Sequence, residues 1–445
     1  MHSRRPIPIK ALAKSSLFSG ALPRLQRSPS LTEGTRSSSQ QPLRGWKVST
    51  QSGGDSLLVA LARRCIPCSS GAMKVPLCVG LLVGVLVAIG QESQPFVEYP
   101  EETRQYLKRI QRGEQRHAFN GDRVLGEWQK EARSALLKMT GLARMRRDLS
   151  SFRPVVTEGT AVEVGGAYHR SLCKIETEPG ISIPFYLLVP KSPERNLRFP
   201  LFLCPHGHDR LGLHSYAGVF RDDAHREKIL GRQGNIAELA VRRGFVALVP
   251  ATRGLADEVL VPDPKGRHGN RPCRAQLMHC LVAGRTPVGE RVWDMQCLLD
   301  WAESHPSVDK SRIVMSGNSG GGVVTAYTAA LDERVRIAVP GCSFTSVVSP
   351  EEFIFHCDCC MVPGLRDWGD WSDLGGLVAP RRLLLVHGVK DGLHSRKAVE
   401  ATAALVEKIF AATGVPDHFD LRWGQEGHRF YPELMWSFIE DGINR

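Results

Sequence analysis

Residues 312–322, RIVMSGNSGGG, decide the fold. They predict a short apolar strand, a G-x-S-x-G turn and the start of a helix, which is the context that a serine nucleophile elbow requires. Such a turn is sharp and strains its central residue, and Gly317 and Gly321 carry no side chain that would collide there. We therefore expect the Ser319 hydroxyl to project above a sheet, at a helix N-terminus that favours negative charge. An ordinary Gly-rich turn between a core strand and a helix is the alternative interpretation.

Two downstream segments supply the partners that an activated serine needs, a histidine base and a carboxylate that orients it. Residues 382–392, RLLLVHGVKDG, predict a buried strand with Asp391 just beyond its end. Residues 419–430, FDLRWGQEGHRF, predict a last strand followed by His428 in a Gly-flanked loop. Open α/β sheets place their chemistry at this end of their strands. We therefore expect Ser319, Asp391 and His428 to converge as nucleophile, acid and base.

Other acidic and histidine residues compete for the same roles. Asp370 and Asp373 also lie between the serine and His428, but in a Trp/Gly-rich loop with no strand before it. His387 and His394 flank the predicted acid, and we interpret them as structural or pocket residues. Asp391 remains the preferred acid.

An earlier segment, residues 199–209, FPLFLCPHGHD, predicts a strand that ends in Pro-His-Gly. Gly207 allows a tight backbone that can aim an amide inward, as an oxyanion hole requires. We expect the donors to be the backbone N–H groups of His208 and Gly320. An ordinary exit from a strand into a loop is the alternative. We expect His206 to be a hydrogen-bonded structural residue beneath the site.

The net charge of +12 over 445 residues is concentrated at the N-terminus. Residues 1–72 contribute +9 and Lys74 adds one, so the segment from residue 91 onward carries about +2. A nearly neutral catalytic region gives no electrostatic argument for nucleic acid. We therefore expect no nucleic-acid partner.

The N-terminal region predicts export rather than a folded domain. Residues 1–72 are rich in Ser, Arg, Gln and Pro, and we interpret them as disordered or as an upstream over-extension of the reading frame that begins before Met73. Residues 73–90 combine one lysine, an apolar run and a small-residue boundary, as a signal peptide does. The run is too short for a stable membrane span, which predicts a secreted or periplasmic protein. A long basic targeting segment and a membrane-anchored chain are the alternatives.

Twelve cysteines are many for a cytosolic enzyme, and nine of them follow residue 90. Residues 356–360, HCDCC, could suggest a metal cluster. They lack the paired C-x-x-C spacing of structural zinc sites, and no second cluster along the chain completes them. We therefore predict no metal at Cys357–Cys360, and expect packed thiols or a disulfide near the pocket.

The whole pattern predicts an α/β fold with a doubly wound, mostly parallel sheet and helices on both faces. Residues 91–150 predict a helical segment that packs on the outside of the domain, and residues 151–445 predict the catalytic domain itself. The segment 253–285 has little regular pattern, so we expect it to line or cover the pocket.

From about Trp128 to the C-terminus the chain resembles the α/β-hydrolase superfamily. Within it, the resemblance is to acetyl xylan esterases and dienelactone hydrolase-like secreted bacterial esterases. Three stretches carry the resemblance: VDKSRI (308–313) leading into the elbow, AALDERV (329–335), and the segments that end in Asp391 and His428. The resemblance implies a serine esterase that cleaves carboxylic esters through an acyl-enzyme, often acetyl esters of carbohydrate. It implies no metal and no organic cofactor, and a small-molecule or carbohydrate ester as the partner.

The chain departs from the acetyl xylan esterase pattern at three places. Gly320 stands where those enzymes usually carry Gln, and His208 stands where they often carry Tyr. The Cys357–Cys360 loop is also unlike theirs. The fold and the triad therefore transfer better than the acetyl-xylan substrate does. A prolyl-oligopeptidase-like peptidase and a non-enzymatic binding protein with a hydrolase fold remain alternative functions.

Overall fold

The computed structural model describes residues 99–194 and 196–444, which belong to one compact unit. The segments 1–72 and 73–90, for which we predict an extension and a signal peptide, lie outside these residues. Within the described part of the chain, no helix combines the length and the apolar character needed to cross a membrane.

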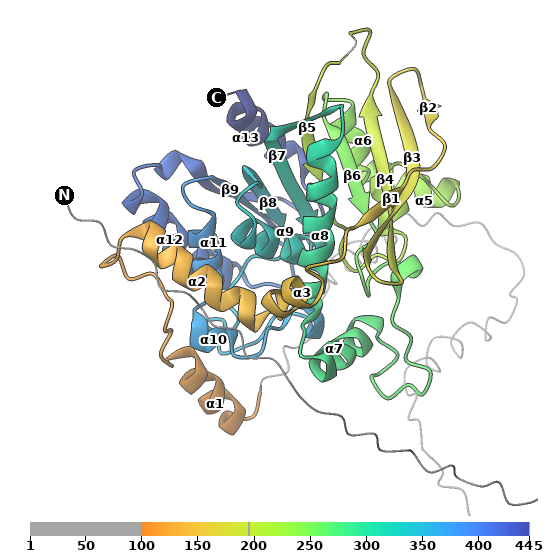
Figure 1. Cartoon of the computed structure of the whole chain (residues 1–445). Helices are drawn as coiled ribbons and strands as arrows, with labels where there is room; N and C mark the ends of the chain where they lie inside the picture. The colour runs from red at the N-terminus through yellow and green to blue at the C-terminus, as the bar shows by residue number, and fades with distance from the viewer. Residues whose placement is uncertain (1–98, 195, 445) are drawn as a thin grey trace, which may run out of the picture. The chain divides into compact units, whose positions relative to one another are not determined.

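A ten-stranded sheet forms the centre of this unit (Figure 1). Its order is β1-β3-β4-β6-β5-β7-β8-β9-β10, with β2 paired to β3 beside this path. The strands from β6 to β10 run parallel, whereas β1 to β4 pair antiparallel at one side. The strands are β1 (Val155–Thr157), β2 (Val162–Val164), β3 (Tyr168–Glu178), β4 (Ile181–Pro190), β5 (Phe199–Leu203), β6 (Val246–Pro250), β7 (Val308–Asn318), β8 (Ile337–Gly341), β9 (Arg382–Gly388) and β10 (Phe419–Gly424).

The connections of the sheet reverse direction between β5 and β7. From β5 the chain moves outward to β6, and from β7 it moves the opposite way to β8, although β5 and β7 are neighbours. In open α/β sheets this switch point opens a crevice at the carboxyl ends of the two strands. The segments that follow β5 and β7 contain His208 and Ser319, so the topology alone brings these two residues to one crevice.

Helices cover both faces of the sheet (Figure 1). Trp436 of α13 packs on Phe202 and Phe245, so α13 lies on the same face as α6. On the other face α8, α9 and α11 pack on one another and on the sheet. The α-helices are α1 (Glu101–Gln111), α2 (Leu125–Met139), α3 (Leu142–Asp148), α4 (Gly212–Tyr216), α5 (Asp223–Gly231), α6 (Ile236–Val241), α7 (Pro272–Ala283), α8 (Pro287–Ser304), α9 (Gly320–Leu331), α10 (Leu365–Trp368), α11 (Trp371–Val378), α12 (Arg396–Ala412) and α13 (Pro432–Asn444); short 3₁₀ turns span Asp257–Val259, Asp358–Cys360 and Pro416–His418.

The core explains why the central strands read as continuous apolar runs. Every residue of β6, β8 and β9 is buried, as expected for parallel strands covered on both faces. All twelve residues of α9 are buried as well. The helix that follows the elbow is therefore fixed by packing along its whole length, and its first turn is held rigidly under Ser319.

Three helices, α1 to α3, occupy the segment predicted to be helical before residue 150. Trp128 of α2 is fully buried, and its indole N–H donates to the carbonyl of His117 at 2.7 Å. The Arg133 side chain donates to the carbonyl oxygens of Ala330 and Leu377. These contacts fasten α2 to the ends of α9 and α11.

Residues 253–285, whose sequence shows little regular pattern, contain the helix α7. The apolar residues of α7 itself are spread over all sides of the helix, so its sequence shows no helical period of hydrophobicity. The residues that indicate a helix lie at its two ends. Pro272 occupies the first turn, and Gly284 adopts a left-handed conformation with φ 65° just past the last turn.

Candidate active site

Ser319 has the strained backbone that the elbow sequence predicts. Its φ of 59° and ψ of −124° lie in a region that residues with a side chain rarely adopt. Its amide donates to the carbonyl of Gly341 at 2.9 Å, which fixes the turn to the end of β8. A Cβ at Gly317 would lie 2.5 Å from the carbonyl oxygen of Pro205, and one at Gly321 would lie 2.1 Å from the same atom. Only glycine therefore fits at both positions.

The segment after β5 lies directly against the elbow. A Cβ on Gly207 would come within 2.9 Å of the Ser319 Cβ and 3.1 Å of the Gly320 nitrogen. Gly320 is the first residue of α9, where amides have no partner within the helix. The backbone of the Gly207–His208 turn therefore runs beside the free amide end of α9, as an oxyanion hole requires.

His206 has the structural position that the sequence predicts. It is fully buried, and its Nε2 accepts the amide N–H of Thr252 at 3.0 Å. The Thr252 hydroxyl returns a hydrogen bond to the carbonyl of His206 at 2.8 Å. Burial lowers the pKa of His206 to about 4, so the ring is neutral at physiological pH. This pair of bonds ties the turn after β5 to the end of β6.

Asp391 and His428 meet beyond the ends of β9 and β10. His428 Nδ1 lies 2.8 Å from Asp391 Oδ2, and the Leu393 amide donates to Asp391 Oδ1 at 2.9 Å. His428 Nε2 is buried and makes no hydrogen bond with any residue that the structure describes. The histidine is therefore held by the carboxylate on one side and keeps its other nitrogen available.

Backbone hydrogen bonds join the two loops that carry this pair. The amides of Val389 and Lys390 donate to the carbonyls of Gly424 and Glu426 at 2.9 and 3.0 Å. A Cβ on Gly388 would lie 2.2 Å from the carbonyl oxygen of Gly427, so glycine is needed for this approach. Asp391 and His428 are thus presented by two loops that are hydrogen-bonded to each other.

Electrostatics keep the acid charged. Burial acts to raise the pKa of Asp391, but the neighbouring His394, the hydrogen bond and charge of His428 and the hydrogen bond from the Leu393 amide outweigh it and hold the pKa well below its usual range. His394 Nδ1 lies 3.8 Å from the same carboxylate. Burial lowers the pKa of His387 to about 3, so that ring stays neutral beside the pair.

The rival acids have a different task. Asp370 and Asp373 form a capping box at the start of α11. The Asp370 side chain accepts the backbone N–H of Asp373, and the Asp373 side chain accepts the backbone N–H of Asp370. Asp373 also accepts the Phe119 amide at 2.9 Å. Their carboxylates are thus engaged with backbone groups.

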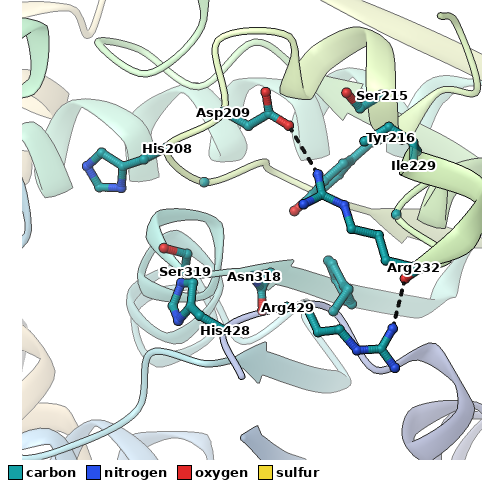
Figure 2. Close-up of a pocket in the computed structure, with 13 residues that line it drawn as sticks. His208, Asp209, Ser215, Tyr216, Ile229, Arg232, Asn318, Ser319, His428 and Arg429 are labelled. Carbon is teal, nitrogen blue, oxygen red and sulfur yellow. Dashed lines mark hydrogen bonds and ion pairs between the residues drawn. The ribbon is translucent and has the colours of Figure 1, made fainter. Parts of the chain in front are cut away.

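Two cavities adjoin the serine. The smaller, about 150 Å³, is shown in Figure 2, where Ser319 and His428 lie together and Asp209 and Arg232 lie across the space from them. The larger, about 580 Å³, is also lined by Ser319 and His428 and extends toward Arg271 and the Cys-rich segment. Ser319 and His428 therefore border both cavities.

A second cluster of reactive side chains lies at the wall of the larger cavity, and the sequence analysis missed it. His208, Cys273, Cys357 and Cys359 place one ligand atom each within 4.8 Å of one another. The fold brings Cys273 of α7 and His208 of the turn after β5 to the Cys-rich segment, a grouping that spacing along the sequence does not reveal. No disulfide forms among the nine cysteines from Cys173 to Cys360, all of which are free thiols.

Comparisons with known proteins agree with this architecture. Residues 278–348 match the family model for acetyl xylan esterase (AXE1), a stretch that includes Ser319 and ends before Asp391. A crystal structure from Bacteroides fragilis, described as an acetyl xylan esterase, has a TM-score of 0.58 at 18% identity and covers 75% of this chain and 84% of that one. A methylesterase has a TM-score of 0.54 at 20% identity over 77% of this chain and 68% of that one.

The chain has the α/β-hydrolase fold and is similar to acetyl xylan esterases. The predicted doubly wound fold is thereby confirmed. A protein of Bacillus subtilis (strain 168) described as the hydrolase YtaP is 28% identical over 151 residues, which are 33% of this chain. The matched residues cover 50% of the length of that relative, so the chain spans about half of it.

Proposed function

We propose that this α/β-hydrolase is a serine esterase that cleaves carboxylic esters of carbohydrates. The observation that carries the proposal is the position of Ser319. It occupies a strained elbow at the start of α9 and shares both cavities with His428, whose other nitrogen is held by Asp391 at 2.8 Å. The match to the acetyl xylan esterase family over residues 278–348 supports the same reaction class.

In the proposed mechanism, His428 Nε2 takes the proton of Ser319 as the hydroxyl attacks the ester carbonyl. Asp391, kept charged by its histidine neighbours, holds the ring in the tautomer with the proton on Nδ1 and stabilises the cation that forms. The amides of Gly320 and His208 bind the oxyanion, and one such donor is worth about 3 kcal/mol in the transition state. His428 then protonates the leaving alcohol and activates the water that releases the acid.

The lining of the smaller cavity supports a hydroxyl-rich substrate. Asp209 and Arg232 face each other at 3.8 Å, and Arg429 donates to the carbonyl of Arg232 at 3.3 Å (Figure 2). Fixed donors and acceptors around a small space suit sugar hydroxyls better than a long acyl chain. We assign the sugar to this side.

We further propose that the enzyme acts outside the cytoplasm. The support is the sequence of residues 73–90, with its basic start, apolar run and small-residue boundary, which is typical of a signal peptide. Expression from Met73 in a secreting bacterial host should give a mature N-terminus close to Gln91. Secreted protein that retains residues 73–90 would contradict this.

The esterase proposal is tested with Ser319→Ala. We expect the variant to stay folded and to lose several orders of magnitude in turnover of 4-nitrophenyl acetate, acetylated xylan and methyl uronates. The matched control is Ser311→Ala, an exposed serine on the same strand β7, which should keep wild-type rates. A folded Ser319→Ala enzyme with near-wild-type turnover would contradict the assignment.

The same preparation separates the two alternative functions. A prolyl-oligopeptidase-like enzyme would cleave proline-containing peptides faster than the esters. A binding protein would cleave neither, and a fluorophosphonate probe would not label Ser319. We expect labelling at Ser319, identified by peptide mass spectrometry, and its loss in His428→Gln, because the base generates the nucleophile.

A further inference from the structure

We propose that His208, Cys273, Cys357 and Cys359 bind one zinc ion at the wall of the larger cavity. We call these four residues the Cys₃His cluster. Cys273 lies in α7, and His208 follows β5. Cys357 directly precedes the 3₁₀ turn Asp358–Cys360, and Cys359 lies within it. The four ligand atoms all lie within 4.8 Å of one another.

The spacing of these atoms fits a tetrahedral ion. Zinc binds thiolate sulfur at about 2.3 Å and imidazole nitrogen at about 2.0 Å, which places two sulfurs about 3.8 Å apart and a sulfur and a nitrogen about 3.5 Å apart. In the structure, Cys357 Sγ lies 3.8 Å from Cys273 Sγ and 3.9 Å from Cys359 Sγ. His208 Nε2 lies 3.4 Å from Cys359 Sγ. The ligand shell is therefore close to its final size.

The surroundings balance the charge of such a site. Three thiolates and one Zn²⁺ leave a net charge of −1, which needs a cation when it is buried. The guanidinium of Arg291 is buried, and its Nη1 donates to Cys359 Sγ at 3.4 Å. The same side chain is fixed by the carbonyl of Arg253 and by Gln276, both at 2.9 Å. A permanent positive charge is thus held against the sulfur that would carry part of the negative charge.

The exposure of the cluster provides an entry path. Cys273 and Cys359 are buried, whereas Cys357 is half-buried and His208 is exposed. A metal ion can therefore reach the cluster from the cavity side. Four protein ligands fill the coordination of zinc and leave no open position for a substrate, which indicates a structural ion.

The structural role would extend to the neighbouring active site. The ion would join α7, the Cys-rich segment and the turn after β5 into one unit. His208 contributes its ring to the ion and its backbone amide to the proposed oxyanion hole, so zinc would fix the position of that amide. The site itself does not depend on the proposed esterase function, because metal content is read without any substrate.

The test measures zinc in the full chain, purified under reducing conditions from zinc-supplemented cells. We expect about one zinc per chain, and X-ray absorption showing three sulfurs at about 2.3 Å and one nitrogen. Cys273→Ser and Cys357→Ser should each weaken zinc binding at least about tenfold against a competing chelator. The matched control is Cys280→Ser, on the same helix α7 but outside the cluster, which should keep its zinc.

A second measurement covers the case in which a ligand variant fails to fold. Wild-type protein stripped of metal and titrated with cobalt should develop the intense near-ultraviolet absorption of cobalt–thiolate bonds, and zinc should displace it. The proposal is overturned if wild-type protein neither contains nor takes up zinc or cobalt. It is also overturned if non-reducing peptide mass spectrometry finds Cys357 in a disulfide, or if folded Cys357→Ser binds zinc as tightly as wild type does.

Discussion

Replacing Gly321 by alanine should disable the active site without touching a reacting group. The new Cβ would lie 2.1 Å from the carbonyl oxygen of Pro205 and 2.9 Å from the carbonyl carbon of His206. Both atoms belong to the backbone of the turn after β5, which hydrogen bonds with Thr252 hold in place. The turn or α9 must move by about 0.9 Å before the contact reaches the 3.0 Å that real Cβ atoms tolerate.

This displacement sets the expected magnitude. The His208 amide moves with the turn, and a misplacement of about 1 Å in an active site costs about 10²-fold in rate. Overpacking of a fixed interior costs about 1–3 kcal/mol in stability. We expect Gly321→Ala to lower kcat on 4-nitrophenyl acetate about 10²-fold and to lower Tm by several degrees, with a smaller change in KM.

The matched control is Gly231→Ala at the end of α5, where an added Cβ meets nothing within 4 Å. That variant should keep wild-type kcat and gain about 0.5 kcal/mol in stability, because alanine restricts the unfolded chain. Thermal melting and kcat are measured on both proteins in parallel. Gly321→Ala with wild-type kcat and Tm would refute the argument that the elbow and the turn after β5 are in fixed contact.

Three further predictions concern charge. Arg253→Met should lower the free energy of unfolding in urea by about 3–5 kcal/mol, because it leaves the buried carboxylates of Asp294 and Glu178 without the guanidinium that contacts both. The control Arg396→Met breaks an exposed ion pair and should lower that free energy by less than about 0.5 kcal/mol. Equal losses in the two variants would contradict this prediction. Asp391→Asn should keep the fold and lose about 10⁴-fold in kcat, and a loss below tenfold would remove Asp391 from the triad. The pKa of Asp391 is lowered in the folded state, so the charged carboxylate stabilises the fold fully above about pH 5. This stabilisation is lost as the pH falls below about 3.9, the usual pKa of an aspartate, toward the pKa in the folded state. The Tm of Asp391→Asn should therefore fall less than the Tm of wild type between pH 5 and pH 2.

The positions at strand ends could be predicted because short-range signals fix them. An apolar run followed by glycine marks the end of a buried parallel strand, and parallel strands bring their carboxyl ends to one edge. Ser319 and Asp391 each follow such a run, whereas His428 follows the half-buried strand β10, whose mixed sequence also ends in glycine. The structure places Asp391 and His428 in contact. Their catalytic roles remain predictions that the variants above test.

The Cys₃His cluster could not be predicted in the same way. Cys273 and Cys357 are 84 residues apart, and Cys359 and His208 are 151 residues apart. Spacing rules for metal sites describe ligands on one hairpin or helix and have no term for ligands that only the tertiary fold assembles. Helix α7 was missed for a related reason, since a helix that is apolar on several sides has no period to detect.

The hydrogen bonds between the loops after β9 and β10 have a consequence for how related sequences can diverge. Because the amides of Val389 and Lys390 donate to the carbonyls of Gly424 and Glu426, the loops that carry Asp391 and His428 form one rigid unit at the edge of the sheet. The walls of the two cavities come largely from other segments, 208–234 and 342–360. Insertions or exchanges in those walls can therefore change the shape of the two cavities while the contact between Asp391 and His428 is kept. If the proposed function holds, substrate range can vary on this scaffold without a change in the acid–base pair.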